Sequence, residues 1–79
     1  MPAVFSKTLV RALHVRSFEI LADSTSGWEV FEAEDERVFL RQRYTDWHRV
    51  ERAALRFAQL VGDLQRQGWE ERPADPAGM

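Results

Sequence analysis

The sequence contains 79 residues, of which 44% are hydrophobic and 30% are charged, and its formal net charge is −2. This length accommodates one domain with a small core, and the composition excludes a chain that is intrinsically disordered throughout. The absence of cysteine excludes disulfides, thiolate metal ligands and cysteine nucleophiles, and it is typical of a reducing cytoplasm. No apolar run reaches the roughly 20 residues of a membrane span. Polar residues also interrupt the apolar N-terminus, so we expect neither a membrane segment nor a signal peptide.

The first segment, residues 3–13, fits two conformations. Phe5, Leu9 and Leu13 recur at helical spacing, whereas the β-branched residues between them permit an extended strand. We favour a further strand, either continuous with the next one or preceding it. The alternative is a segment that folds over one face of the sheet.

The next segment, residues 14–22, predicts a strand whose Phe18 and Ile20 face a helix. Small polar residues and a glycine follow it at positions 23–27, and they are typical of a turn. We therefore expect a loop that leads into a second pair of strands.

Two further runs, residues 27–34 and 37–44, predict a hairpin that turns at Asp35 and Glu36. Its register follows from placing apolar residues opposite one another on the face towards the helix. The expected pairs on that face are Ala33 with Val38 and Phe31 with Leu40, and those on the other face are Glu34 with Arg37, Glu32 with Phe39, Val30 with Arg41 and Trp28 with Arg43.

The longest predicted element is a helix over residues 46–67. Its apolar positions occupy one arc of a helical wheel, as in a helix that packs on a sheet. Thr45 or Asp46 is suited to cap its N-terminus. Gly68 is suited to the left-handed position after its C-terminus, with Trp69 packing back on the last turn. The apolar positions are Trp47, Val50, Ala53, Ala54, Phe57, Leu60, Val61 and Leu64.

Together these elements predict an α+β fold. The sheet is antiparallel and has three strands, or four if residues 3–13 add one, and one long C-terminal helix packs on one of its faces. We expect a single domain over residues 1–70. Residues 71–79 contain two prolines and no apolar cluster, so we expect them to form a disordered tail.

The sheet face that points away from the helix is expected to be half apolar. A face exposed to water should be mostly polar, so this face is expected to have a partner. Self-association into a homodimer is the leading explanation. The others are a cover formed by residues 3–13 and a platform for a ligand. The candidate interface residues are Leu21, Trp28, Val30, Phe39, Arg41 and Arg43.

The same face supplies an alternative function. Aromatic rings interleaved with arginines on a sheet are typical of single-strand nucleic-acid binding, because bases stack on the rings while arginines contact phosphates. The order of antiparallel strands and then a helix resembles, in topology alone, the half-repeat of PUR-type single-strand-binding proteins. The net negative charge, together with Glu32 and Glu34 on that face, opposes phosphate binding.

Catalysis and metal binding find little support in the spacing of polar residues. His14 and His48 lie in different predicted elements, and no pair of metal ligands has the helical i, i+4 spacing. Asp46 and His48 are about 200° apart around a helix, so they form no dyad on one helix face. No serine occupies a strand–turn–helix elbow. We therefore expect no enzymatic activity, metal, cofactor or small-molecule substrate.

A second basic feature lies on the predicted helix, where Arg49, Arg52 and Arg56 are spaced i, i+3, i+7 opposite the apolar stripe. Residues 37–56 contain six arginines and two acidic residues, whereas residues 23–36 contain six acidic residues and no basic ones. The simplest interpretation is that the three arginines form the solvent-exposed face of an amphipathic helix. The functional interpretation is contact with phosphates or with an acidic partner.

The leading functional hypothesis is a small, cytoplasmic, non-enzymatic interaction or scaffold module that self-associates through its exposed sheet face. The alternative hypothesis is a single-strand nucleic-acid-binding module that uses the arginines and aromatic rings of that face. Neither hypothesis identifies a biological partner.

Overall fold

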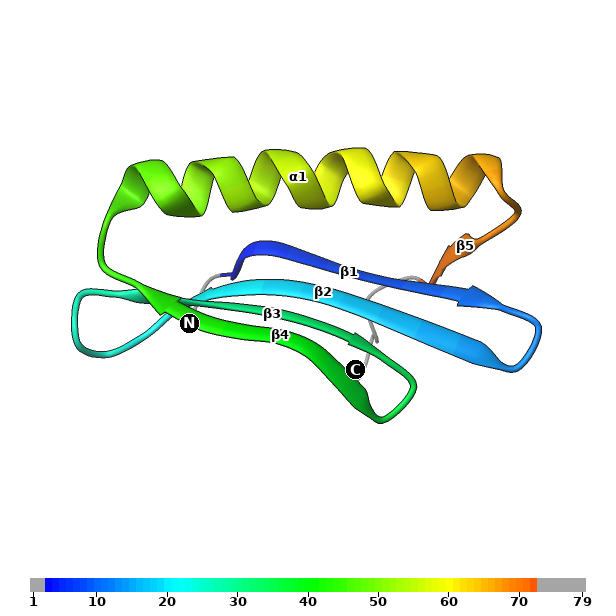
Figure 1. The fold of residues 1–79 in the computed structure, drawn as a ribbon, viewed down its shortest axis with the longest axis horizontal. Helices are drawn as coiled ribbons and strands as arrows, with labels where there is room; N and C mark the ends of the chain where they lie inside the picture. The colour runs from blue at the N-terminus through cyan, green and yellow to red at the C-terminus, as the bar shows by residue number, and fades with distance from the viewer. Residues whose placement is uncertain (1–2, 73–79) are drawn as a thin grey trace, which may run out of the picture.

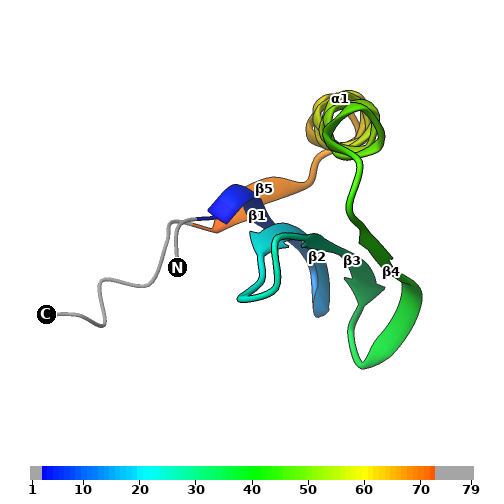
Figure 2. The same ribbon diagram turned by 90° about the vertical axis from the view of Figure 1, so that its left-hand side faces the viewer.

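The computed structural model describes residues 3–72. One antiparallel sheet with the strand order β4-β3-β2-β1-β5 is covered on one face by the single helix α1 (Figure 1). Figure 2 looks along the helix and shows the sheet curving away beneath it. The elements are β1 (Ala3–Arg11), β2 (His14–Ala22), β3 (Trp28–Glu34), β4 (Arg37–Tyr44), α1 (Trp47–Arg66) and β5 (Glu70–Arg72).

The predicted α+β class is therefore confirmed, but two of its details are wrong. The sheet formed by the described residues has five strands, which exceeds the three or four expected. The helix is not the last element, because β5 follows it and pairs with β1 at the sheet edge away from β4.

The ambiguous N-terminal segment is a strand, as favoured above. β1 pairs with β2 from Phe5, opposite Ile20, to Arg11, opposite His14. A tight turn joins the two strands, and Ala12 adopts a positive φ of 55° within it. Residues 3–11 thus extend the sheet sideways and do not fold over either face.

The β3–β4 hairpin follows the predicted register only next to its turn. Ala33 pairs with Val38 as expected, but Glu32 pairs with Leu40, so Phe39 is an extra residue that forms a bulge in β4. The bulge shifts all later pairs by one residue. Phe31 pairs with Arg41, Val30 with Gln42, Glu29 with Arg43 and Trp28 with Tyr44, which corrects the expected pairs of these residues.

The two faces of β3 are also reversed relative to the prediction. Val30 is fully buried in the core beneath α1, and the Trp28 ring packs 5.3 Å from the Trp47 ring. Strand alternation places Phe31 and Val38 on the face away from the helix, although both were expected to face it. Apolar residues occur at both the even-numbered and the odd-numbered positions of β3, so its sequence alone did not determine which face of the strand points towards the helix.

The core lies between the sheet and the helix and is centred on aromatic contacts. The Phe57 ring meets Phe18 edge-on at 5.2 Å and Phe5 at 5.8 Å. Such tilted pairs of rings are favourable. The buried cluster is Leu9, Phe18, Ile20, Val30, Val50, Phe57, Val61 and Leu64.

Both predicted helix ends are confirmed. The Asp46 carboxylate caps the N-terminus by accepting a hydrogen bond of 3.0 Å from the backbone N–H of His48. At the other end Gly68 has a φ of 100°, and the N–H of Trp69 donates to the Leu64 carbonyl at 3.0 Å. This turn reverses the chain and directs β5 onto β1.

Two smaller expectations need correction. Trp47 was placed in the core, but as the first residue of α1 it remains 45% exposed. Glu71 and Arg72 were placed in the disordered tail, but they belong to β5, and the rest of that predicted tail lies outside the described residues. Within residues 3–72, no helix is both long and apolar enough to cross a membrane.

Candidate functional site

The residues of the predicted interface do not share one face of the sheet. Trp28 and Val30 lie on the helix side, whereas Leu21 and Arg41 lie on the other side. Phe39 stands at the bulge, where its ring lies 6.0 Å from the guanidinium of Arg16. The expected aromatic–arginine platform is therefore not formed. A different pair takes its place, since the Arg41 guanidinium lies 5.3 Å from the ring centre of Phe31.

Arg43, the sixth residue of that set, is engaged by the β2–β3 loop. Its Nε donates to Asp23 Oδ2 at 2.7 Å, and its terminal nitrogen donates to Thr25 Oγ1 at 2.7 Å. A Cβ on Gly27 would collide with this guanidinium, so glycine leaves room for it. The hydrogen bond from Arg43, supported by the Thr25 and Gly27 backbone N–H groups, holds the pKa of Asp23 well below its usual range. Arg43 thus has a structural role in fixing this loop.

Replacing Arg43 with glutamine is expected to raise the pKa of the Asp23 carboxyl towards its ordinary value of 3.8. Because the folded-state pKa is lowered, the stability that Asp23 contributes is fully present above that ordinary value and is lost as pH falls through the folded-state value. The variant should therefore begin to unfold at a higher pH than the parent. Carbon-13 NMR of the Asp23 carboxyl during an acid titration measures the change.

Arg41→Gln is the matched control, because Arg41 lies on the same strand and contacts a ring. This variant should leave the Asp23 titration unchanged. If Asp23 titrated in Arg43→Gln as it does in the parent protein, Arg43 would not be the cause of its lowered pKa.

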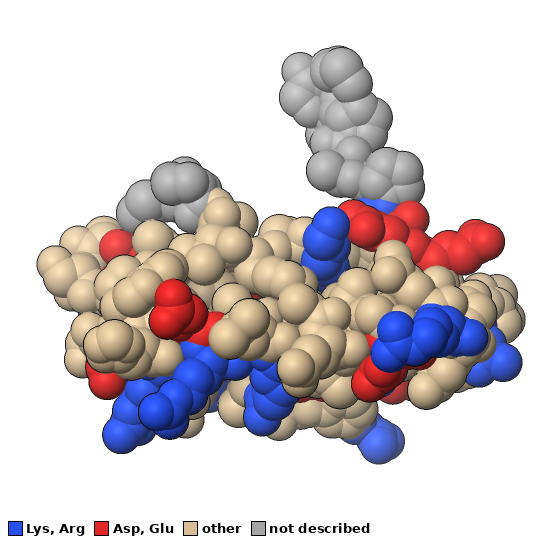
Figure 3. Space-filling view, turned by 90° about the horizontal axis from the view of Figure 1, so that it is seen from above, with Lys and Arg blue, Asp and Glu red and all other residues tan. Residues whose placement is uncertain are grey.

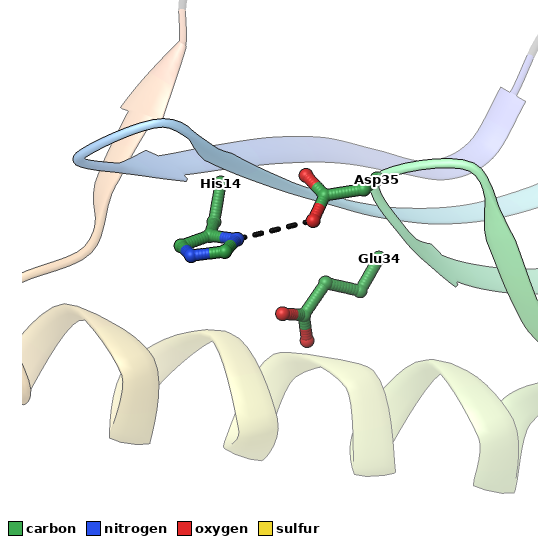
Figure 4. A group of neighbouring side chains, drawn as sticks. All are labelled: His14, Glu34 and Asp35. Atoms are coloured by element: carbon green, nitrogen blue, oxygen red, sulfur yellow. Dashed lines mark hydrogen bonds and ion pairs between the residues drawn. The ribbon is translucent and has the colours of Figure 1, made fainter.

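A second polar cluster joins the two hairpin turns at the same end of the sheet (Figure 4). His14 Nδ1 lies 3.1 Å from Asp35 Oδ2, and the Val15 N–H donates to Asp35 Oδ1 at 3.0 Å. The hydrogen bond with His14, and then that from Val15, lowers the pKa of Asp35. Sequence reasoning missed this cluster, because its members come from two turns that only the folded sheet brings together.

One imidazole and two carboxylates, those of Glu34 and Asp35, place potential metal ligand atoms within 4.8 Å of one another. Each group already has a protein partner, however. His14 and Asp35 pair with each other, and Glu34 Oε1 lies 3.8 Å from Arg16 Nε. The contact between His14 and Asp35 therefore links the β1–β2 turn to the β3–β4 turn.

A groove lies between α1 and β4 and is called the arginine groove from here on. It is a hollow of about 320 Å³ whose apolar floor is formed by Leu40 and Ala53, above the buried Val30. It continues past Tyr44 and Arg49 into a second hollow of about 350 Å³ beside the end of β4. Figure 3 shows basic side chains gathered along one long side of the molecule. The groove residues are Val30, Leu40, Tyr44, Arg49, Arg52, Ala53 and Arg56.

The three helix arginines of the groove were singled out from the sequence but were expected opposite the apolar stripe. Arg49 and Arg56 each directly precede a buried residue, Val50 and Phe57. One residue is about 100° around the helix, so these arginines lie on its flank. Because that flank borders β4, the three arginines form one wall of a groove between the helix and the strand.

The positive charge of the groove is not neutralised within the described chain. No carboxylate among residues 3–72 lies within ion-pair distance of Arg49, Arg52 or Arg56, whereas other arginines of the fold do have acidic partners. The guanidinium of Arg56 lies 5.9 Å from the Phe57 ring centre. Three exposed guanidinium groups beside an apolar floor can bind carboxylates or phosphates through charge-assisted hydrogen bonds.

Comparison with known proteins identifies no relative. No protein-family model matches the sequence, and neither the curated proteins nor the solved structures contain a significant match. The function is therefore inferred from the geometry of the groove and its surroundings.

Proposed function

We propose that this protein is a non-enzymatic interaction module of the cytoplasm that binds an acidic segment of another protein in the arginine groove. The observation that carries the proposal is the placement of Arg49, Arg52 and Arg56. They line a groove of about 320 Å³, and no carboxylate among residues 3–72 lies within ion-pair distance of them. Complementary charge raises the rate of encounter and selects the partner.

The floor of the groove favours a protein segment over a nucleic acid. Leu40 and Ala53 offer apolar surface, which suits the aliphatic parts of amino-acid side chains. Single-strand nucleic-acid binding instead relies on exposed rings on which bases stack. The Trp28 ring is partly buried and occupied by Trp47, which removes the best candidate for such stacking.

Replacing Arg49, Arg52 and Arg56 together with glutamine is expected to weaken binding of an acidic peptide by roughly threefold to 150-fold, since exposed charge pairs contribute about 0.2–1 kcal/mol each. The measurement is fluorescence anisotropy with a labelled glutamate-rich peptide. The affinity of the parent protein should also fall as ionic strength rises, because these charges are exposed.

A control variant removes the same number of charges elsewhere. Arg11, Arg66 and Arg72, replaced together with glutamine, lie on β1, at the end of α1 and on β5, outside the groove. Equal loss of affinity in the two triple variants would show that only net charge matters and would reject the groove. Tighter binding of a labelled single-stranded oligonucleotide than of the peptide would instead favour the nucleic-acid function.

Self-association is the second candidate, and the face of the sheet away from the helix supports it. Strand alternation places Val15, Leu21, Phe31 and Val38 there. Leu21 and Val38 are both exposed. A second copy that covered this face would add apolar burial to a small core. Sedimentation equilibrium tests the idea, and a monomer at every protein concentration would reject it.

A further inference from the structure

The outer edge of β4 runs alongside the arginine groove. β4 is an edge strand of the sheet, and within residues 3–72 no strand pairs with its outer side. In an antiparallel pair, alternate residues turn their backbone N–H and C=O groups away from the neighbouring strand. Such an edge, next to a groove for side chains, is the arrangement by which a sheet accepts an added peptide strand.

Charge determines which segment fits this edge. β4 itself contributes Arg37 and Arg41, and the helix arginines line the groove beside it. The opposite edge of the sheet is formed by β5, which begins with Glu70 and Glu71. Edge arginines also discourage pairing between the β4 strands of two copies, because like charges would meet. The edge therefore selects an acidic strand from another protein.

We propose that an acidic segment of a partner protein adds to β4 as a further strand, with carboxylates at alternate positions facing Arg49, Arg52 and Arg56. This inference rests on the proposed function and adds the binding mode and the sequence pattern of the partner. The backbone of the segment bonds to the edge of β4, and its acidic side chains enter the arginine groove.

The spacing of the arginines sets that pattern. α1 runs roughly along the strands (Figure 1), and with a rise of about 1.5 Å per residue Arg49 and Arg56 are about 10 Å apart along the helix. Side chains on one face of a strand recur about every 6.7 Å. Two successive carboxylates on the same face of the added strand fit within this span. The preferred motif is thus acidic–any–acidic.

The first test compares two labelled eight-residue peptides of equal composition. One alternates glutamate with threonine, and the other carries its glutamates in one block. Their charges are equal, so purely electrostatic attraction gives equal affinities. The added strand predicts that the alternating peptide binds about fivefold or more tightly, because only it directs every carboxylate to one face.

The second test removes backbone donors from the alternating peptide. One version carries N-methyl groups on all glutamates, and the other carries them on all threonines. Only one of these alternate sets faces β4. Methylation of that set should weaken binding by about tenfold or more, since several backbone hydrogen bonds are lost, whereas methylation of the other set should weaken it far less.

Amide hydrogen exchange of the parent protein with the unmodified alternating peptide completes the experiment. Alternate β4 amides should exchange more slowly when the peptide is bound. If the peptide binds in an arginine-dependent way but β4 amides are not protected and both methylated peptides bind alike, the added strand is wrong and the proposed function stands. If the peptide does not bind, or binds independently of the arginines, the proposed function fails as well. If β4 amides exchanged more slowly as the protein concentration rose, with no peptide present, the edge would instead be occupied by a second copy of the chain.

Discussion

Replacing Phe57 with alanine is expected to cost about 3–5 kcal/mol of unfolding free energy, which is typical of a buried phenylalanine. Phe57 is fully buried, and its ring contacts both Phe18 and Phe5. A small domain has little stability to lose, because domains in general have only about 5–15 kcal/mol. The variant should therefore unfold at a much lower urea concentration than the parent protein. Urea unfolding followed by tryptophan fluorescence measures the loss.

Leu55→Ala is the matched control on the same helix. Leu55 is 62% exposed, so the change should lie within about 0.5 kcal/mol of the parent protein. Phe57→Leu keeps an apolar side chain and should fall between the two variants. A loss at Phe57 as small as that at Leu55 would contradict the packing of α1 on the sheet.

The helix was predictable because its determinants are local. Asp46 caps it, the apolar residues keep helical spacing, and Gly68 ends it through a left-handed turn. Each of these features acts over a few residues, so the sequence contains them without reference to the rest of the fold. The boundaries agree with the prediction to within one residue at each end.

The strand at the end of the chain was not predictable in the same way. β5 contains only Glu70, Glu71 and Arg72, so it has no apolar pattern. It forms because the turn at Gly68 directs the chain onto β1, where Lys7 Nζ meets Glu71 Oε2 at 2.8 Å. These contacts join residues from opposite ends of the sequence, and no local pattern reveals them.

The arginine groove was half predictable. The i, i+3, i+7 spacing identified its three helix arginines, but their partner surface depends on β4. The bulge at Phe39 turns Leu40 and Tyr44 towards the helix side and thereby completes the groove. A bulge is one extra residue in a strand, and nothing in the alternation of residues 37–44 marks it. The expected interface residues lie on different faces because β3 has the opposite phase, which places Trp28 and Val30 on the helix side.

Removing the carboxylate of Glu32 is expected to cost about 3 kcal/mol, because it leaves the poorly solvated charge of Arg16 with only the more distant Glu34 carboxylate, at 3.8 Å, as a partner. Arg16 donates to Glu32 Oε2 at 2.8 Å, and the two side chains are only 17% and 12% exposed. The Arg16 guanidinium also lies 5.3 Å from the Phe18 ring centre. Urea unfolding of Glu32→Ala measures the loss. Lys7→Ala, which breaks the more exposed Lys7–Glu71 pair, should cost less than about 1 kcal/mol.

The same pair also bears on the phase of β3, which the sequence left undecided. With Trp28 and Val30 inward, Glu32 also lies on the helix side, where Arg16 stabilises it. Replacing both partners with apolar residues, Arg16→Met with Glu32→Leu, should restore most of the stability, because the remaining charge, that of Glu34, is on a side chain that is 33% exposed. The register should be kept, since a one-residue slip would turn Val30 and the new leucine to the solvent face. NMR should then show one set of Phe31 and Trp28 signals, with the Trp28–Trp47 contact retained. Two sets of signals would show that the charged pair, and not the apolar residues of β3, selects the register.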